Sequence, residues 1–232
     1  DLANMDTVVS EDLADVLLEN GTLPIFHRFT SFQTQEYWVR KYKGNCFISC
    51  GINSNAMENV KKLLDLGAIG VCIDVAHGHS DMMMEFIHRL KSTHPDKQII
   101  AGNVCTPIAY HDLVNAGADA VKVGIGGGAA CTTRIVTGFG IPQFTAIREC
   151  AEIAHKLRVP LIADGGIKQS RDVVLALAAG ASTVMVGKLF ALTQESAAEK
   201  TYDETNTLVA KYRGQASEDF QNEYYGGLKV KT

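Results

Sequence analysis

The stretch QIIAGNVCTPIAYHDLVNAGADAVKVG, residues 98–124, holds a complete strand–helix–strand unit. Its two ends, Gln98–Asn103 and Ala120–Gly124, are short and mostly apolar, which is typical of parallel strands buried on both faces. Pro107–Ala116 has the spacing of an amphipathic helix, and Gly117 after it can take the left-handed conformation that ends a helix. The stretch therefore predicts one parallel β-α-β unit.

The same pattern extends along the chain in both directions. Further strands are predicted at Leu23–His27, Cys46–Gly51, Ile69–Asp74, Val159–Asp164 and Thr183–Gly187. Further helices are predicted at Ser10–Asn20, Asn55–Leu66, Asp81–Thr93, Phe144–Leu157 and Gln169–Ala179. The triplets Leu66-Gly67-Ala68, Ala116-Gly117-Ala118 and Ala179-Gly180-Ala181 recur where a helix gives way to a strand, so the units form a faint internal repeat.

The number of these units predicts the fold class. With Leu2-Ala3-Asn4 as the end of one more strand, they predict an α/β fold, a TIM (β/α)8 barrel whose first strand is truncated at the N-terminus. We expect one catalytic domain over residues 1–232, with 200–232 as its flap and C-terminal segment. An open doubly wound sheet is the alternative. Barrel chemistry lies where strands end, here at Asn4, His27–Arg28, Asp74, Asn103, Gly124–Arg134, Asp164–Gly166 and Gly187–Lys188.

The composition of the chain indicates which kinds of binding partner and which cell compartment to expect. The net charge of −4 argues against a nucleic-acid or an anionic membrane partner. The longest uncharged run, Val173–Gly187, is shorter than the roughly 20 apolar residues of a membrane span. The six cysteines include no CxxC pair and sit mostly in apolar runs, which favours buried thiols in a reducing compartment. We therefore expect a cytoplasmic protein.

The densest chemical signal is the glycine-rich segment Lys122–Arg134, which follows a predicted strand. Glycines let the backbone approach a ligand closely, and a cysteine in such a loop near Lys or Arg is a candidate nucleophile. Cys131 is that cysteine. The alternative is that Cys131 is one more buried structural thiol.

Three other strand ends are candidate binding positions. Backbone N–H groups at Asp164-Gly165-Gly166 and Gly187, together with Lys188, would hold a phosphate, although turn formation alone also explains these glycines. Asp74 is placed to accept a hydrogen bond from a ligand amide or hydroxyl. His77, His79 and Asp81 nearby match a metal-binding pattern only weakly.

These residues resemble the IMP dehydrogenase and GMP reductase family over nearly the whole chain. The motifs that carry the resemblance are Val123-Gly124-Ile125-Gly126, Cys131-Thr132-Thr133-Arg134, Thr137-Gly138-Phe139-Gly140, Pro142-Gln143, Asn4-Met5-Asp6-Thr7, Ala101-Gly102-Asn103-Val104, Ala163-Asp164-Gly165-Gly166 and Tyr212-Arg213-Gly214.

The resemblance implies a TIM barrel, usually a homotetramer, that binds the purine nucleotides GMP or IMP at its strand ends. It implies that Cys131 attacks C2 of the purine. In the reductases this expels ammonia from GMP, and hydride from NADPH then gives IMP. In the dehydrogenases IMP loses hydride to NAD, and the resulting adduct is hydrolysed to XMP.

The resemblance also implies a role for each matching position. Cys131 and Thr133 would be catalytic. Substrate would be bound by Asp164, Gly165, Gly166, Gly187, Lys188, Gly214, Gln215 and Ala216. NADPH would be bound by Arg28, Asp74, Val75, Ala76, Ile125 and Gly126. A monovalent cation, K+ in some members, would lie among Gly126, Gly128, Cys131 and Arg134.

Three features favour the reductase branch, namely His27-Arg28-Phe29, the segment Asp74–Ser80 and Lys122. The short connection Phe29–Asn45 also lacks the regulatory insertion typical of the dehydrogenases. We therefore expect a GMP-reducing enzyme, with IMP dehydrogenase as the alternative.

Two departures from the family pattern favour a third class, a nucleotide-binding paralogue with little catalysis. Ala129 replaces a serine that would contact phosphate. The Tyr224-Tyr225-Gly226-Gly227 region lacks the flap glutamate that reductases pair with the threonine.

Overall fold

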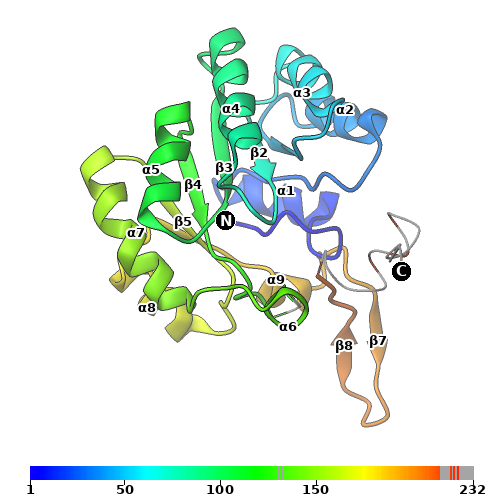
Figure 1. Cartoon of the computed structure of the whole chain (residues 1–232). Helices are drawn as coiled ribbons and strands as arrows, with labels where there is room; N and C mark the ends of the chain where they lie inside the picture. The colour runs from blue at the N-terminus through cyan, green and yellow to red at the C-terminus, as the bar shows by residue number, and fades with distance from the viewer. Residues whose placement is uncertain (130, 132, 215–219, 221, 223, 225–232) are drawn as a thin grey trace, which may run out of the picture.

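The computed structural model describes residues 1–129, 131, 133–214, 220, 222 and 224. Its described part is built on a sheet of six parallel strands in the order β1-β2-β3-β4-β5-β6, with helices packed outside it (Figure 1). The strands are β1 Phe47–Cys50, β2 Gly70–Asp74, β3 Gln98–Val104, β4 Ala120–Val123, β5 Leu161–Asp164 and β6 Thr183–Met185. The helices are α1 Glu11–Glu19, α2 Phe32–Lys41, α3 Ala56–Asp65, α4 Asp81–Thr93, α5 Pro107–Ala116, α6 Thr133–Thr137, α7 Gln143–Leu157, α8 Ser170–Ala178 and α9 Lys188–Ala191.

Both edges of this sheet are continued by the N-terminal segment. At one edge Ile25 forms a parallel bridge with Phe47, and the Phe26 N–H donates to the Phe47 carbonyl at 2.9 Å. At the other edge Leu2 forms a parallel bridge with Val186, and the Ala3 N–H donates to the Val186 carbonyl at 3.0 Å. The sheet is thus a curled half-barrel, consistent with a TIM barrel, and complete eight-stranded closure stays a prediction.

The strands are buried on both faces, as their apolar runs predict. In β2, Val71 and Ile73 belong to the large cluster that includes the helices, whereas Cys72 between them belongs to a second, smaller cluster. Successive side chains of a strand point to opposite faces, so the second cluster marks the concave side of the sheet. Its buried members are Ala3, Ile25, Phe47, Cys72, Ile100, Ile162 and Met185. They come from all six strands except β4, and from both N-terminal bridging segments.

Local signals explain where several helices begin and end. The side chains of Ser10, Ser80 and Thr106 accept N–H groups of the first turns of α1, α4 and α5, which satisfies donors that have no partner within the helix. Gly117 takes φ 114° at the end of α5, confirming the predicted left-handed cap.

The structure differs from the sequence prediction at several places, which include the short helices α6 and α9 that the sequence pattern did not predict. The predicted strand Leu23–His27 contributes only the bridge at Ile25. Helix α2 was not predicted, because its buried face is short and includes the polar Gln35 beside Trp38 and Val39. The C-terminal segment contains an antiparallel hairpin, β7 Lys200–Tyr202 and β8 Leu208–Ala210, that projects away from the sheet and its helices (Figure 1).

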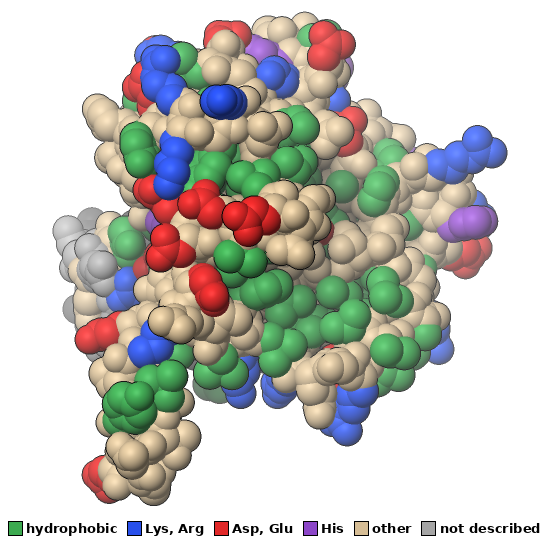
Figure 2. All heavy atoms as spheres, turned by 180° about the vertical axis from the view of Figure 1, so that it is seen from behind, with side chains coloured by type: hydrophobic (Ala, Val, Ile, Leu, Met, Phe, Trp, Pro, Cys, Tyr) green, Lys and Arg blue, Asp and Glu red, His purple; other side chains and the backbone are tan. Residues whose placement is uncertain are grey.

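The surface carries apolar area as well as charge. On the face opposite to that of Figure 1, hydrophobic side chains gather over the middle of the molecule, with acidic side chains grouped next to them (Figure 2). On α8, Val174, Leu175 and Leu177 are also exposed. In the described residues, none of the helices is both long enough and apolar enough to cross a bilayer.

Replacing Gly70 with alanine should destabilise the fold. A methyl group there would overlap the Gln98 carbonyl oxygen of the neighbouring strand and lie 2.5 Å from Phe47 Cε1. We expect the free energy of unfolding to fall by about 1–3 kcal/mol in urea titrations. Gly51→Ala is the matched control, since its methyl would meet Arg28 Nη1 at 3.6 Å, an ordinary contact. Equal stability of the two variants would contradict this packing.

Candidate active site

The carboxyl ends of the strands open into one cleft, and most of the predicted site residues line it. Those residues are Asp74, Val75, Ala76, Ile125, Gly126, Gly128, Cys131, Thr133, Asp164, Gly165, Gly166, Gly187, Lys188 and Gly214. They come from segments that follow β2, β4, β5 and β6 and from the C-terminal segment. The predicted Gln215 and Ala216 lie outside the described residues.

The two predicted arginines lie beside the cleft rather than among its lining residues. Arg28 Nε is 4.0 Å from Asp74 Oδ2, and its guanidinium lies over the Phe29 ring. Arg134 donates to the carbonyls of Ile125 and Ile141, so it braces the backbone that follows β4.

A buried lysine joins two strand ends at the floor of the cleft. Lys122 in β4 is 1% exposed, and its Nζ lies 2.7 Å from Asp74 Oδ1 and 3.1 Å from Asp164 Oδ2. Asn103 adds a second link, because its Nδ2 donates to Asp164 Oδ2 at 2.9 Å and to the Gly124 carbonyl at 2.8 Å. The ends of β2, β3, β4 and β5 are thereby held together by polar side chains.

The charge state of Lys122 follows from this geometry. Burial alone would lower its pKa, but the carboxylates of Asp74 and Asp164 outweigh burial and raise the pKa well above its ordinary value. A raised pKa in the folded state stabilises the fold at neutral pH, and this stability is lost only as the pH rises through the raised value. Lys122 therefore acts as a fixed positive charge between two acids.

Environment separates Cys131 from the other thiols. Cys46, Cys72 and Cys150 are buried, and burial raises the pKa of each to about 12, so they stay protonated and unreactive near neutral pH. Cys131 is only half-buried and lines the cleft, and its thiol lies 3.1 Å from the Thr133 hydroxyl. The prediction of buried thiols is confirmed for Cys50 as well, and the half-buried Cys131 is the candidate nucleophile at the site.

Close backbone packing explains the glycines after β4 and β5. A methyl group on Gly124 would overlap the Asp164 carbonyl oxygen, and one on Gly165 would lie 3.0 Å from the Gly128 nitrogen. Both glycines also have positive φ, 148° and 103°. The loop that leads to Cys131 and the predicted phosphate loop therefore touch, which only residues without side chains allow.

The C-terminal segment reaches the same cleft through contacts with the N-terminus. Arg213 Nη2 lies 2.6 Å from Asp6 Oδ2, and the Tyr212 hydroxyl donates to the Met5 sulfur at 3.5 Å. Burial raises the pKa of Tyr212 to about 12, so the phenol stays neutral. These contacts join the C-terminal segment to the N-terminal one, and Gly214 lines the cleft together with Met5.

A family model described as the IMP dehydrogenase / GMP reductase domain matches residues 2–229. This chain belongs to that family. The GMP reductase of Helicobacter pylori (strain ATCC 700392 / 26695) is 44% identical over 223 residues, which make up 93% of this chain and 67% of that protein. The GMP reductase of Bacillus subtilis (strain 168) is 43% identical over the same share of each chain.

Relatives of the other branch also match. The inosine-5'-monophosphate dehydrogenase of Chlorobaculum tepidum is 54% identical over 167 residues, 72% of this chain and 34% of that protein. The chain thus spans about two thirds of the length of these reductases and about a third of that dehydrogenase. The comparisons assign the family and leave its two branches open.

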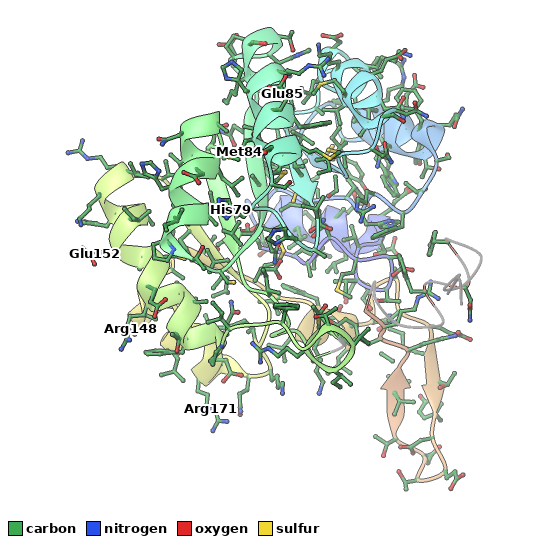
Figure 3. The ribbon with its side chains drawn as sticks, in the orientation of Figure 1. His79, Met84, Glu85, Arg148, Glu152 and Arg171 are labelled. Carbon is green, nitrogen blue, oxygen red and sulfur yellow. The ribbon has the colours of Figure 1, made fainter. Side chains whose placement is uncertain are left out.

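The weak metal-binding pattern of His77, His79 and Asp81 does not form a metal site among the described residues. His79 lies beside α4 and α5 (Figure 3), and its Nε2 is 3.0 Å from Asp112 Oδ2 of α5. The described residues contain no group of three or more His, Cys, Asp or Glu side chains that could hold a metal ion. A second hollow, lined by Asp81, Met84, Glu85, His88, Asp112, Asn115 and Ala116, lies between these helices, away from the strand ends.

Two contributors to the site carry only a weak sequence signal. Lys122 is a charged residue inside an apolar strand, which by itself indicates a buried partner. Gln143, whose side chain reaches the ends of β4 and β5, lies in a family motif but not in a predicted strand end. Its contribution depends on the fold of a loop and cannot be read from local pattern.

Replacing Lys122 with methionine should remove the positive charge that balances the carboxylates of Asp74 and Asp164. Removing one partner of a buried ion pair costs about 3–5 kcal/mol, so we expect a loss of that size in urea titrations near neutral pH. The exposed Lys62, paired with Glu58 at 2.6 Å, supplies the control Lys62→Met, which should change stability little. A similar loss of stability in Lys62→Met and Lys122→Met would contradict this electrostatic account.

Proposed function

We propose that this chain catalyses the NADPH-dependent reductive deamination of GMP to IMP and ammonia. The observation that carries the proposal is the pair of Cys131 and Thr133, 3.1 Å apart, in one cleft with Asp164 and the glycines after β5. The GMP reductases of Helicobacter pylori and Bacillus subtilis, which align with 93% of the chain, support it. The described part is proposed to form the catalytic TIM barrel, with 200–232 as its flap segment.

The reaction runs in two steps at C2 of the purine. The Cys131 thiolate forms a bond to C2, and the C2–N bond breaks, so that the amino group leaves as ammonia after gaining a proton. Thr133, next to the thiol, is the group proposed to pass that proton. Hydride added to C2 then expels the thiolate and gives IMP, and the covalent adduct divides one hard substitution into two easier ones.

The nucleotide is proposed to lie along the edge formed by the ends of β5 and β6. Asp164 accepts hydrogen bonds from the ribose hydroxyls, and the N–H groups of Gly165, Gly166 and Gly187 with Lys188 hold the phosphate. Gly214 is proposed to reach the base, and Gln215 and Ala216, to which the family resemblance assigns the same role, lie outside the described residues. Ala129 offers no hydroxyl to the phosphate, so Lys188 carries more of that charge.

The residues proposed to face NADPH have chemistry that fits it. The carboxylate of Asp74 is a hydrogen-bond acceptor of the kind that binds the amide N–H of a nicotinamide, and Arg28 lies beside it, with Val75 and Ala76 in the same cleft. Ile125 and Gly126 complete this side of the cleft. When bound, a reduced nicotinamide supplies the hydride. Asp74 and its neighbours orient it and exclude water from the reacting carbon.

A monovalent cation and a homotetramer complete the proposal. Carbonyls of Gly126, Gly128, Cys131 and Arg134 would ligate K+, and although the Gly128 carbonyl accepts the Cys131 N–H at 3.1 Å, its second lone pair can serve. Broad apolar area on the surface is the kind of area that oligomers bury, which supports the homotetramer (Figure 2).

The second candidate activity is oxidation of IMP to XMP with NAD. The 54% identity to the Chlorobaculum tepidum dehydrogenase over 167 residues favours it. The same Cys131 adduct would form, but hydride would leave C2 and water would then release XMP. A third candidate, nucleotide binding with little catalysis, is favoured by Ala129.

The nicotinamide absorbance in two parallel assays separates these candidates. With GMP and NADPH we expect a falling signal and release of one ammonia for each NADPH oxidised. A rising signal only with IMP and NAD would assign the dehydrogenase reaction instead. If the absorbance changes in neither assay, while calorimetry shows that the protein binds GMP, the third candidate, a nucleotide-binding paralogue, would be supported.

Replacing Cys131 with alanine should abolish turnover, by about a thousandfold or more, because no adduct can form. GMP affinity measured by calorimetry should stay within a few-fold, since the thiol forms its bond only during reaction. Cys105→Ala is the matched control, a partly buried thiol at the end of β3 outside the lining of the cleft. Residual turnover in the Cys131 variant, or an equal loss in the control, would argue against covalent catalysis by Cys131.

A further inference from the structure

Gln143, the first residue of α7, lies directly beneath the loop that leads to Cys131. Its Nε2 donates to the carbonyl of Val123 at 2.8 Å and to the carbonyl of Asp164 at 3.2 Å. These carbonyls belong to the last residues of β4 and β5. One side chain thus joins the ends of two neighbouring strands, at the point where the catalytic loop and the phosphate loop begin.

The other end of the same amide faces the loop glycines. Two carbonyl acceptors identify the nitrogen of the amide, so Oε1 must point the other way. A methyl group on Gly124 would lie 2.7 Å from Oε1, and one on Gly127 would lie 3.1 Å from it. The loop backbone therefore passes over the amide with no side chain between them.

Stability alone does not explain a glutamine here. Its Oε1 is buried and has no hydrogen-bond partner among the described residues. A buried acceptor left unpaired costs about 1–3 kcal/mol, which offsets what the two hydrogen bonds from Nε2 contribute. A methionine of similar length would lose both the cost and the bonds. An amide at this position is therefore expected to serve the geometry of the loop.

We infer that Gln143 is a positioning residue, which fixes the glycine loop and with it the Cys131 thiol relative to the ends of β4 and β5. This inference rests on the proposed function, because it assumes that the nucleotide lies against those ends. Displacing a reacting group by about 1 Å costs on the order of a hundredfold in rate. Losing the amide should therefore slow the reaction of bound nucleotide with Cys131 far more than it weakens binding.

Two labelling reactions of Cys131 measure position and reactivity separately. Iodoacetamide reports the intrinsic reactivity of the thiol. A 2-chloropurine ribonucleotide reports its position, since the sulfur forms a bond to C2 only when the nucleotide is bound in place, and chloride leaves. Both products are followed by mass spectrometry of the Cys131 peptide, alongside kcat and KM for GMP and the melting temperature.

In Gln143→Met we expect the limiting rate of nucleotide labelling, and kcat, to fall at least about tenfold. Iodoacetamide labelling, KM and the melting temperature should change little. Arg148→Met is the control, because Arg148 is an exposed long side chain on the outer face of the same helix (Figure 3). It should match the wild type in every measurement.

In Gln143→Glu the acid can donate a hydrogen bond only when protonated, so its nucleotide-labelling rate relative to wild type should recover as the pH falls. The charged groups around this position include Asp164 with Lys122 on the adjoining strands and Arg134 in α6, and the wild type and the variant share all of them. The ratio for Gln143→Met should not vary with pH.

Equal nucleotide-labelling rates in Gln143→Met and wild type would overturn the inference. So would a parallel loss of both labelling reactions and of melting temperature, which would indicate a structural role only. A wild-type Cys131 that reacts with iodoacetamide but not with the nucleotide would overturn the proposed function, and the inference with it.

Discussion

The site depends on one buried charge. Lys122 is almost fully buried, and a charge removed from water is tolerated only with opposite charges at hydrogen-bond distance. Asp74 and Asp164 supply them from strands on either side, so β2, β4 and β5 must end at the same level of the sheet. The same two carboxylates are the acceptors proposed for the cofactor and the substrate. The ion pairs that hold the strand ends in register thus also set the distance between the two proposed subsites.

The loops that lie above Lys122 and its two carboxylates depend on glycines, which have no side chains. The loops after β4 and β5 approach so closely that a methyl group on Gly124 or Gly165 would meet backbone atoms of the other loop. Asn103 and Gln143 fill the polar gaps beneath them with amide groups. The glycine-rich loop after β4 is thus held in one conformation by the segments packed against it. The half-buried Cys131 lies in that loop.

The two candidate reactions are both proposed to use one covalent adduct on Cys131, and this architecture suits both. Nothing in the charged floor distinguishes loss of an amino group from loss of a hydride at C2, because both need the thiol, the ribose acceptor and the phosphate loop in the same places. The difference depends on groups that deliver protons or water to the adduct. The chain is accordingly similar to relatives of both kinds, GMP reductases and an IMP dehydrogenase.

The sequence by itself determined the repeated strand–helix units, the strand ends that carry chemistry and the glycine loop with its cysteine. These are local patterns, since burial on both faces, helix capping and turn formation each involve residues that are near one another in the chain. Only the tertiary structure decided which residues meet. The contact of Lys122 with Asp74 spans 48 residues, and the bridge between Leu2 and Val186 places the N-terminal segment at the β6 edge of the sheet. Helix α2 was likewise missed, because the burial of its polar Gln35 depends on tertiary packing that periodicity does not record. The β7–β8 hairpin was missed because strands of three residues are too short to show an alternating pattern.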